Sequence, residues 1–236
     1  MNIQFRCPPE LADILPRPYP AKRGHPAWLK RMAATAPSAD VHGEIRTVKQ
    51  CPPFVDAMGF GFIVPLVTDI HVDRGSFTWD WEIGPSTVGG YTRSPLSFHL
   101  GEQLAGAPIA DGENAAIKFT NYWTIETPPG CALLVTHPFN REELPFRTLT
   151  GLVDTDRYKG GCIQFPALWR DADYVGVLER GMPIAQCVPV ARDALNLEFG
   201  ELTGDAAKDF MATMDAVNAE PGTYRRRFRV GKPSAG

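Results

Sequence analysis

The stretch over residues 151–190 decides the fold: it reads GLVDTDRYKGG, CIQFPALW, RDADY, VGVLERG and MPIAQCVPV. Short apolar runs alternate there with Gly and Asp, which supply the backbone conformations and side-chain-to-backbone bonds that tight turns require. The pattern predicts one strand pair across the acidic turn at residues 154–156. It predicts a second pair, a hairpin, across Arg180 and Gly181.

Turn residues continue along the whole chain, which holds 22 Gly and 22 Pro in 236 residues. Many turns and short elements favour a mostly β architecture over a helical bundle. We expect an N-terminal extended arm and short helix over residues 1–44, with a polar linker near 36–40. A β domain follows over 45–200. A short C-terminal helix, with apolar residues at helical spacing, and a basic tail occupy 201–236.

The bulk properties exclude several classes of partner. A net charge of −3 gives no basic field, so a nucleic acid polymer is not expected as partner. No run approaches the ~20 apolar residues of a membrane span. The five cysteines form no C-x-x-C pair, and their odd number argues against a complete disulfide framework, which predicts a cytoplasmic protein.

The densest β pattern outside the first stretch covers residues 60–82. Pro65 interrupts a buried run and is expected at an edge or a bulge. A hairpin is predicted across residues 73–75, followed by Trp79 and Trp81 at alternating positions. The two indoles are candidates for stacking on a planar ligand, and core packing is the alternative interpretation.

The acidic turn carries the best candidates for catalysis. A carboxylate at a strand end, such as Asp154 or Asp156, can act as a general base toward water. The ring of the nearby Tyr158 can support a base or a sugar. The alternative is a turn whose Asp side chains accept hydrogen bonds from backbone amides.

At these residues the chain resembles a family. GLVDTDRYKG followed at this distance by ERGMPIAQCVPV resembles the third and fourth motifs of dUTPases, and the Gly-Met-x-Ile-x-Gln variant resembles the related dCTP deaminases. The upstream TPPGCALLV is similar to the turn before the second-motif strand, so the resemblance covers residues 127–190. It implies a β-clip barrel or sandwich that forms trimers. It also implies that Asp154 is the general base, that Tyr158 lies under the sugar and that Gln186 lies near the phosphates.

The chain also departs from the family. Where the family has an Arg-Ser phosphate clamp, this sequence has THPFNR at residues 136–141, which leaves His137 and Arg141 as candidate ligand contacts without the serine donor. The first family motif is absent, so diphosphatase chemistry with magnesium is not expected. Arg157 separates Asp156 from Tyr158, and in a period-two strand this insertion turns Tyr158 to the other face unless it bulges out.

The sequence therefore predicts a protein that binds a small polar molecule, such as a nucleotide, on a dUTPase-like fold; any reaction and any cofactor stay open. A homo-oligomer is expected, a trimer before a dimer, with the proline-rich arm at residues 17–26 docked on its own domain or on a neighbour. The alternative is a non-catalytic assembly protein that uses Trp79 and Trp81 as contacts. A third hypothesis is a metalloenzyme in which some of His71, His99 and His137 converge.

Overall fold

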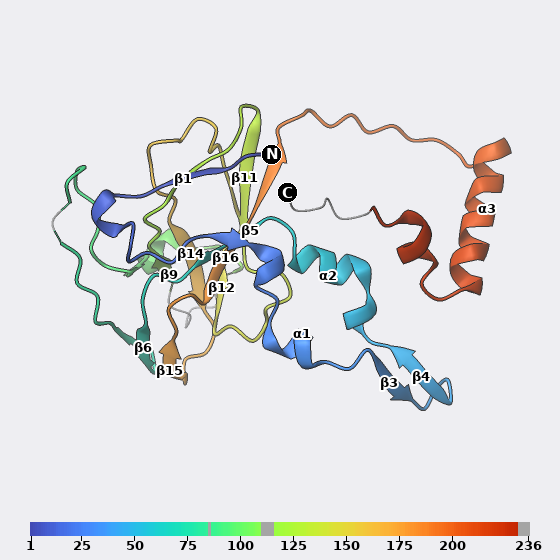
Figure 1. Ribbon diagram of the computed structural model, residues 1–236, viewed down its shortest axis with the longest axis horizontal. Helices are drawn as coiled ribbons and strands as arrows, with labels where there is room; N and C mark the ends of the chain where they lie inside the picture. The colour runs from blue at the N-terminus through green and yellow to red at the C-terminus, as the bar shows by residue number, and fades with distance from the viewer. Residues whose placement is uncertain (85, 110–115, 231–236) are drawn as a thin grey trace. The chain divides into compact units, whose positions relative to one another are not determined.

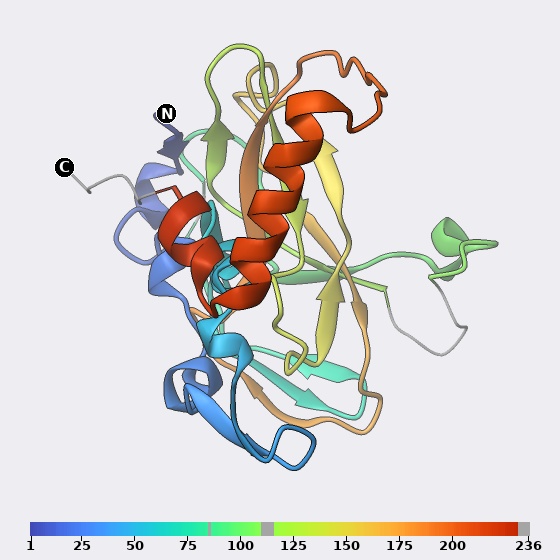
Figure 2. The same cartoon turned by 90° about the vertical axis from the view of Figure 1, so that its right-hand side faces the viewer.

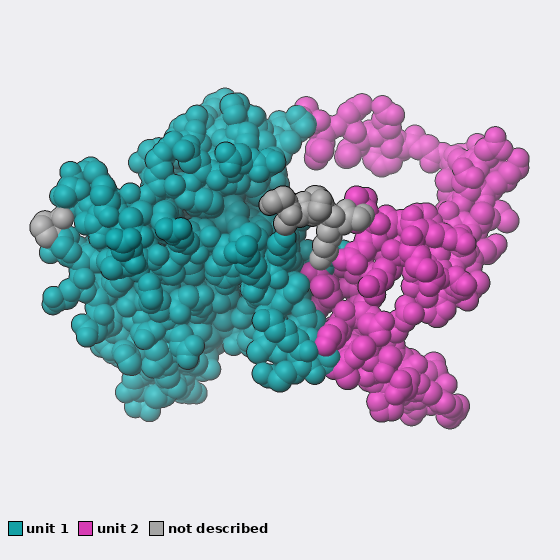
Figure 3. Space-filling view, viewed as in Figure 1, with its two compact units in different colours: residues 1–32, 56–193 teal, residues 33–55, 194–236 magenta. Residues whose placement is uncertain are grey.

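A computed structural model describes residues 1–84, 86–109 and 116–230. It is mostly β with several antiparallel sheets and a C-terminal helix, which confirms the predicted fold class. The chain forms two units, and Figure 3 colours them separately: residues 1–32 and 56–193 form unit 1, and residues 33–55 and 194–236 form unit 2. The domain boundaries predicted at residues 44 and 200 stay predictions.

The central sheet of unit 1 has five strands. Their order is β13 (Gly151–Val153), β11 (Cys131–Thr136), β16 (Pro183–Ala191), β5 (Phe62–Pro65) and β2 (Tyr19–Pro20). Its longest ladder joins β11 and β16, from Cys131 opposite Ala191 to Thr136 opposite Gln186. Figures 1 and 2 both show these strands side by side.

Three further sheets complete unit 1. One has four strands, β12 (Phe146–Thr148), β14 (Phe165–Trp169), β9 (Ala116–Phe119) and β8 (Leu96–Phe98). Another joins β15 (Val175–Leu178), β6 (Ile70–Asp73) and β7 (Ser76–Thr78). The last pairs β1 (Gln4–Arg6) with β10 (Thr124–Glu126).

The main core lies among these sheets. Fully buried side chains from several strands meet there, including Phe119, Phe146, Phe165, Leu133 and Ile184. Each such side chain contributes about 1.5–3 kcal/mol by leaving water. The predicted strand runs are therefore held by packing of large apolar residues.

The strands of the first stretch form as predicted, but their pairing does not. β13 pairs with β11, and β14 pairs with β9 and β12, so no strand pair spans the acidic turn. Likewise β15 pairs with β6, whereas β16 pairs with β11 and β5. The predicted hairpins are wrong because local turn chemistry does not choose a partner, and buried faces from distant segments do.

The other predicted turns are confirmed. β6 and β7 form the expected hairpin, with Arg74 and Gly75 both at positive φ as a two-residue loop requires. Figure 2 shows this pair beside β15. Pro65 lies where the β16–β5 register shifts between Pro183 and Ala185, at a bulge.

The N-terminal arm packs on its own unit. The short helices of unit 1 are η1 (Pro9–Leu11), η2 (Ala21–Arg23), α1 (Ala27–Arg31) and η4 (Gly101–Leu104). Leu11 and Leu15 are buried, and the indole N–H of Trp123 donates to the carbonyl of Pro16 at 3.1 Å. The arm is thus packed into unit 1 by buried side chains and a hydrogen bond.

Unit 2 contains a hairpin and a long helix. β3 (Thr35–Ser38) pairs with β4 (Gly43–Arg46), so the predicted polar linker near 36–40 is a strand and its turn. η3 (Val48–Gln50) and the start of α2 (Pro52–Met58) follow. The remaining elements are α3 (Gly204–Ala219), which confirms the predicted helix, and a π-helical turn, η5 (Tyr224–Phe228). The end of the predicted tail, residues 231–236, lies outside the described residues.

No helix in the described chain is both long enough and apolar enough to cross a membrane.

Candidate functional site

The acidic turn begins where β13 ends. The N–H of Thr155 donates to the carbonyl of Val153 at 2.9 Å, and the N–H groups of Arg157 and Tyr158 both lie within 2.9 Å of the Asp154 carbonyl. The backbone is therefore wound into a turn here. Arg157 lies inside this turn and not in a strand, so the predicted period-two inversion of Tyr158 does not arise.

Asp156 holds three segments together. Its side chain is 7% exposed and forms an ion pair with Arg192, just beyond β16. Its carboxylate also accepts the N–H of Gly130 at 3.0 Å, while the N–H of Arg192 donates to the Gly130 carbonyl at 3.0 Å. The bonds from Arg192 are the main cause that holds the pKa of Asp156 below its ordinary value. Asp156 has the bonding pattern of a structural turn residue.

Asp154 is the more accessible carboxylate. Its side chain is 57% exposed and accepts one bond from Arg192, at 2.6 Å. The two carboxylates, Asp156 before Asp154, raise the pKa of Arg192. Because Arg192 already occupies one oxygen of this carboxylate, the geometry favours an orienting role for Asp154 over proton abstraction.

Gln186 has all of its amide directions satisfied inside unit 1. It is 1% exposed; its oxygen accepts the N–H of Phe139 at 3.0 Å, and its nitrogen donates to the carbonyls of Ala57 at 3.0 Å and Phe60 at 2.6 Å. The side chain ties two segments, residues 57–60 and the chain at Phe139, to β16.

His137 and Arg141 form a second bonded group next to Gln186. The N–H of Thr148 donates to His137 Nδ1 at 3.2 Å, so Nε2 carries the proton and donates to the Arg141 carbonyl at 3.1 Å. Burial lowers the pKa of His137, which favours the neutral ring. The Arg141 side chain is 15% exposed, pairs with Glu143 and donates to the carbonyl of Gly24 at 3.3 Å.

The predicted site residues thus divide into two groups at opposite ends of one strand. Gly130, which bonds Asp156, precedes β11, and His137 follows it. The six residues of β11 at about 3.3 Å each separate the groups by about 20 Å. One small ligand cannot contact both groups.

The two tryptophans are also separated. Trp79 packs against the main core, whereas Trp81 packs against a second cluster that contains Tyr122 and Trp123. The rings of Trp81 and Tyr122 lie 6.2 Å apart between centroids. Trp79 and Trp81 thus belong to different clusters, and their packing supports the core interpretation of the two indoles.

The histidines do not assemble a metal centre in the described residues, where no group of three or more His, Cys, Asp or Glu side chains is placed to hold an ion. His137 uses both ring nitrogens within the fold. His99 Nδ1 lies 3.0 Å from the side-chain oxygen of Gln103, the neighbour predicted from their spacing of four.

A depression of about 410 Å³ lies next to the acidic turn. Its wall includes Gly160, Gly161 and Cys162. The ring of Tyr158 lies against Gly161 of this wall: a Cβ at Gly161 would lie 2.1 Å from Tyr158 Cζ. The other lining residues come from the arm, the following loop and β10: Arg6, Cys7, Pro8, Val88, Gly89, Gly90, Tyr91, Tyr122 and Thr124.

The edge of this depression has an excess of positive charge. Lys159 and Arg6 both pair with Glu126, at 2.9 Å and 3.0 Å. Lys159 first and then Arg6 lower the pKa of Glu126. One carboxylate therefore shares two cations, which leaves a net positive charge for an anionic group of a ligand.

The thiols and phenols of the depression are neutral. Burial raises the pKa of Cys7 and of Cys162, so neither is a thiolate nucleophile at neutral pH. Burial raises the pKa of Tyr122 to about 12. Their chemistry suits contact and hydrogen bonding.

Sequence reasoning missed Arg192, Arg6, Lys159, Tyr91 and Tyr122. One sequence feature could have indicated Arg192: it is the first cation after the apolar run at residues 182–191. Arg6 and Tyr91 reach the depression only through the pairing of β1 with β10 and through the second cluster of unit 1. These are long-range contacts that no local pattern announces.

Comparisons with known proteins identify no family for this chain. No family model matches it, and no curated protein matches it. Among solved structures, the chain is similar to a mutant dUTPase from phage phi11 of S. aureus, with 12% sequence identity and a TM-score of 0.35. That match covers 85% of this chain and 97% of the other. A score at this level does not establish a shared fold.

Proposed function

We propose that unit 1 binds a small polar molecule with a planar ring and an anionic group, the chemical class of a nucleotide, in the depression beside Tyr158. The observation that carries the proposal is the combination of phenol rings and Arg6 on its walls with Lys159, the neighbour of the lining residue Gly160, which shares the carboxylate of Glu126 with Arg6. The pocket predicted near Asp154, Tyr158, His137, Arg141 and Gln186 is thereby narrowed to the side of the acidic turn, because the polar groups of His137, Arg141 and Gln186 are bonded within the fold.

The dimensions and chemistry of the depression suit such a ligand. A volume of about 410 Å³ lies within the range of about 300–1,000 Å³ typical of small-molecule sites. Tyr91 and the half-exposed Tyr158 offer ring surface to a planar group. Arg6 and Lys159 can donate charge-assisted hydrogen bonds to a phosphate or carboxylate.

The proposal is one of binding and not of dUTPase activity. Asp154, the general base that the resemblance implies, is paired with Arg192. The segment 136–141 supplies neither the serine of the family's clamp nor a free arginine, because Arg141 is bonded to Glu143 and Gly24. We therefore regard Asp154 as a residue that orients the turn beside the depression.

The experiment is a thermal-shift measurement on the full chain with deoxyuridine, dUMP and dUTP, each with and without magnesium. A ligand that binds the folded state raises the melting temperature. Val88→Trp should fill the depression and abolish the shift, since Val88 lines it and is 66% exposed. Val175→Trp, at a valine in β15 that is 63% exposed, is the matched control.

A rise with dUMP or dUTP that Val88→Trp removes and Val175→Trp retains supports the site. Equal shifts in both variants would place the ligand elsewhere. A flat response to all three probes would contradict the proposal and favour the second candidate function.

That second candidate is self-association as an assembly protein, a trimer before a dimer. It is favoured by residues 195–199, where Leu195, Leu197 and Phe199 alternate with polar residues and are 90%, 72% and 94% exposed. This period of two is typical of a strand with one buried face. An extended segment with such exposed side chains gains stability by covering them on a second copy.

Unit 1 also carries an apolar groove of about 520 Å³, lined by residues that include Ile3, Phe5, Phe60, Phe62 and Pro189.

Light scattering on the full chain tests the assembly. Leu197→Asp with Phe199→Asp should reduce an oligomer to a monomer, whereas Val230→Asp, at a valine that is 86% exposed, should not. A monomeric mass for the wild type at micromolar concentration would refute this candidate.

A further inference from the structure

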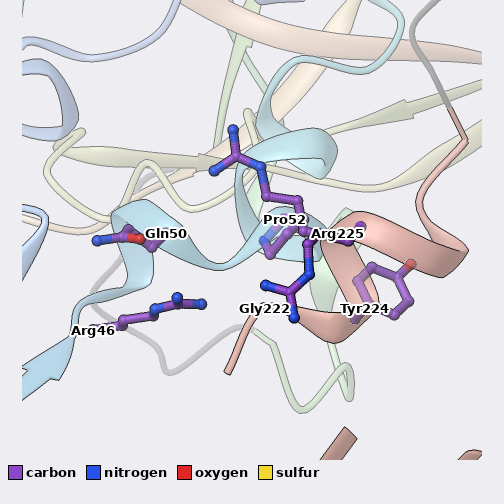
Figure 4. Close-up of a pocket in the computed structure, with 7 residues that line it drawn as sticks. Arg46, Gln50, Pro52, Gly222, Tyr224 and Arg225 are labelled. Atoms are coloured by element: carbon purple, nitrogen blue, oxygen red, sulfur yellow. The ribbon is translucent and has the colours of Figure 1, made fainter. Parts of the chain in front are cut away.

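Three arginines line one pocket within unit 2. The pocket has a volume of about 400 Å³, and its lining residues are Arg46, Gln50, Pro52, Gly222, Tyr224, Arg225 and Arg226. Figure 4 shows that they come from two segments: Arg46, Gln50 and Pro52 from one, and Gly222, Tyr224 and Arg225 from the other. None of them is among the predicted site residues.

The first segment is held rigidly enough to aim Arg46. Arg46 ends β4, opposite Thr35 of β3. Just beyond it, the hydroxyl of Thr47 donates to the carbonyl of Ala33 at 2.6 Å, and the amide nitrogen of Gln50 donates to the carbonyl of Ala34 at 3.0 Å. These bonds fix the chain on both sides of the pocket wall.

The second segment is fixed by Thr223. This residue is 2% exposed, and its hydroxyl lies 3.0 Å from the carbonyl of Ala216 and 2.8 Å from that of Glu220. Gly222, at φ +88°, turns the chain between α3 and η5. The turn places Tyr224, Arg225 and Arg226 at the start of η5, beside the pocket.

Two of the guanidinium groups converge on one point. A Cβ at Gly222 would lie 2.8 Å from Arg46 Nη1 and 3.4 Å from Arg226 Nη1. Like charges held this close repel unless an anion lies between them or beside them. Glu220 pairs with Arg226, but among the described residues no carboxylate pairs with Arg46 or Arg225. The pocket therefore keeps an excess of two positive charges.

We propose that this pocket binds a small phosphate-bearing anion. A phosphate carries up to two negative charges and several acceptor oxygens, which match the planar donor forks of two or three arginines. The phenol of Tyr224 lies on the same wall and adds a neutral donor. The site lies within unit 2, so it is independent of the ligand that we propose for the depression of unit 1.

The test is calorimetric titration of the full chain with inorganic phosphate at low ionic strength. We expect saturable binding with one site. Arg46→Gln and Arg225→Gln should each weaken the affinity by about tenfold or more, since each removes a charged donor. Arg227→Gln is the matched control, because it removes the same charge from the same turn without lining the pocket. It should change the affinity by less than about twofold.

A second arm uses a single-stranded oligonucleotide of mixed sequence. If the oligonucleotide binds and inorganic phosphate does not, the arginines serve a polymer and the proposal fails. It also fails if phosphate shows no saturable binding to the wild type, or if Arg46→Gln and Arg225→Gln bind like Arg227→Gln. Circular dichroism melting of each variant shows whether a loss of binding reflects unfolding of unit 2.

Discussion

At the scale of single residues, hydrogen bonding decides which polar side chains remain available to a ligand. The amide of Gln186 bonds to three backbone groups, and both ring nitrogens of His137 have partners. Asp156 bonds to Gly130 and Arg192. Of the predicted polar residues, Asp154 and Tyr158 keep more than half of their surface exposed.

Gln186→Leu should lower the free energy of unfolding by about 1–3 kcal/mol, because it leaves buried partners of the amide unsatisfied. Chemical denaturation of the variant measures this change. If Gln186 instead contacted a ligand, the variant would keep the stability of the wild type and lose only the ligand-induced thermal shift.

The two aspartates of the turn should respond differently to substitution. Asp154→Asn keeps a polar, exposed side chain and should leave the melting temperature almost unchanged while it weakens the shift caused by dUMP. Asp156→Asn loses an ion pair that is largely shielded from water and should lower the melting temperature more. The opposite order would make Asp154 the structural residue of the turn.

The stability should depend on pH through His137. Burial, partly offset by the bond to Arg141, lowers the pKa of this ring in the folded state. The unfolded chain then binds a proton more readily, so stability is full above the unfolded value of about 6.5 and falls as the pH drops from there toward the folded pKa. Denaturation at several pH values between 5 and 8 gives the free energy of unfolding as a function of pH. The slope of this free energy against pH should be smaller for His137→Gln than for the control His71→Gln, at an exposed histidine. Equal slopes would exclude His137 as the cause.

At the scale of elements, the sequence indicates where strands and turns lie but not which strands pair. The hairpin at Arg74 and Gly75 is local, so its two-residue loop specifies it. The strands on either side of the acidic turn pair instead with segments from elsewhere in the chain. The residue types at a position predict a turn there. Which strands pair depends instead on which of their buried faces pack together in the folded chain.

Gly61 illustrates a constraint that only the pairing creates. It has φ +72°, and a Cβ there would lie 2.1 Å from the carbonyl oxygen of Cys187 in β16. Gly75 has φ +83° with no atom within 4 Å of the same position. Gly61→Ala should therefore cost about 1–3 kcal/mol more than Gly75→Ala in free energy of unfolding, because it adds overpacking to backbone strain. Equal costs in denaturant titrations would show that the sheet yields at this contact.

At the scale of the whole molecule, the arrangement of strands explains how much of the site the sequence could indicate. The ring of Tyr158 lies against Gly161, which lines a depression, and a ligand site beside the acidic turn stays a prediction. His137, Arg141 and Gln186 lie about 20 Å away, at the other end of β11. The order of motifs in the sequence gives no distances between those motifs in the folded chain. Arg6 and Tyr91 line the depression together with residues 160–162, although the three segments lie far apart in the sequence.

The same arrangement predicts that dUTP hydrolysis will be negligible. Asp154 is paired with Arg192, and Arg141, the cation of the segment 136–141, is paired with Glu143 and so is not a free donor that could stabilise charge at the phosphates. Such preorganised donors contribute several kcal/mol to transition-state stabilisation in enzymes. Pyrophosphate release from dUTP with magnesium should equal that of buffer alone. Release at an ordinary enzymatic rate would overturn this account of the turn.

The central claim is that the depression of unit 1 recognises a planar anionic ligand through Lys159 and Arg6. Calorimetric titration with dUMP and with deoxyuridine, in the wild type and in Lys159→Gln, tests it most directly, with Lys208→Gln of α3 as a control for net charge. We predict that Lys159→Gln weakens dUMP binding by about tenfold and deoxyuridine binding by less than about twofold, because only dUMP carries the anionic group. The claim would be contradicted if the wild type did not bind dUMP, or if Lys159→Gln and Lys208→Gln bound dUMP with equal affinity.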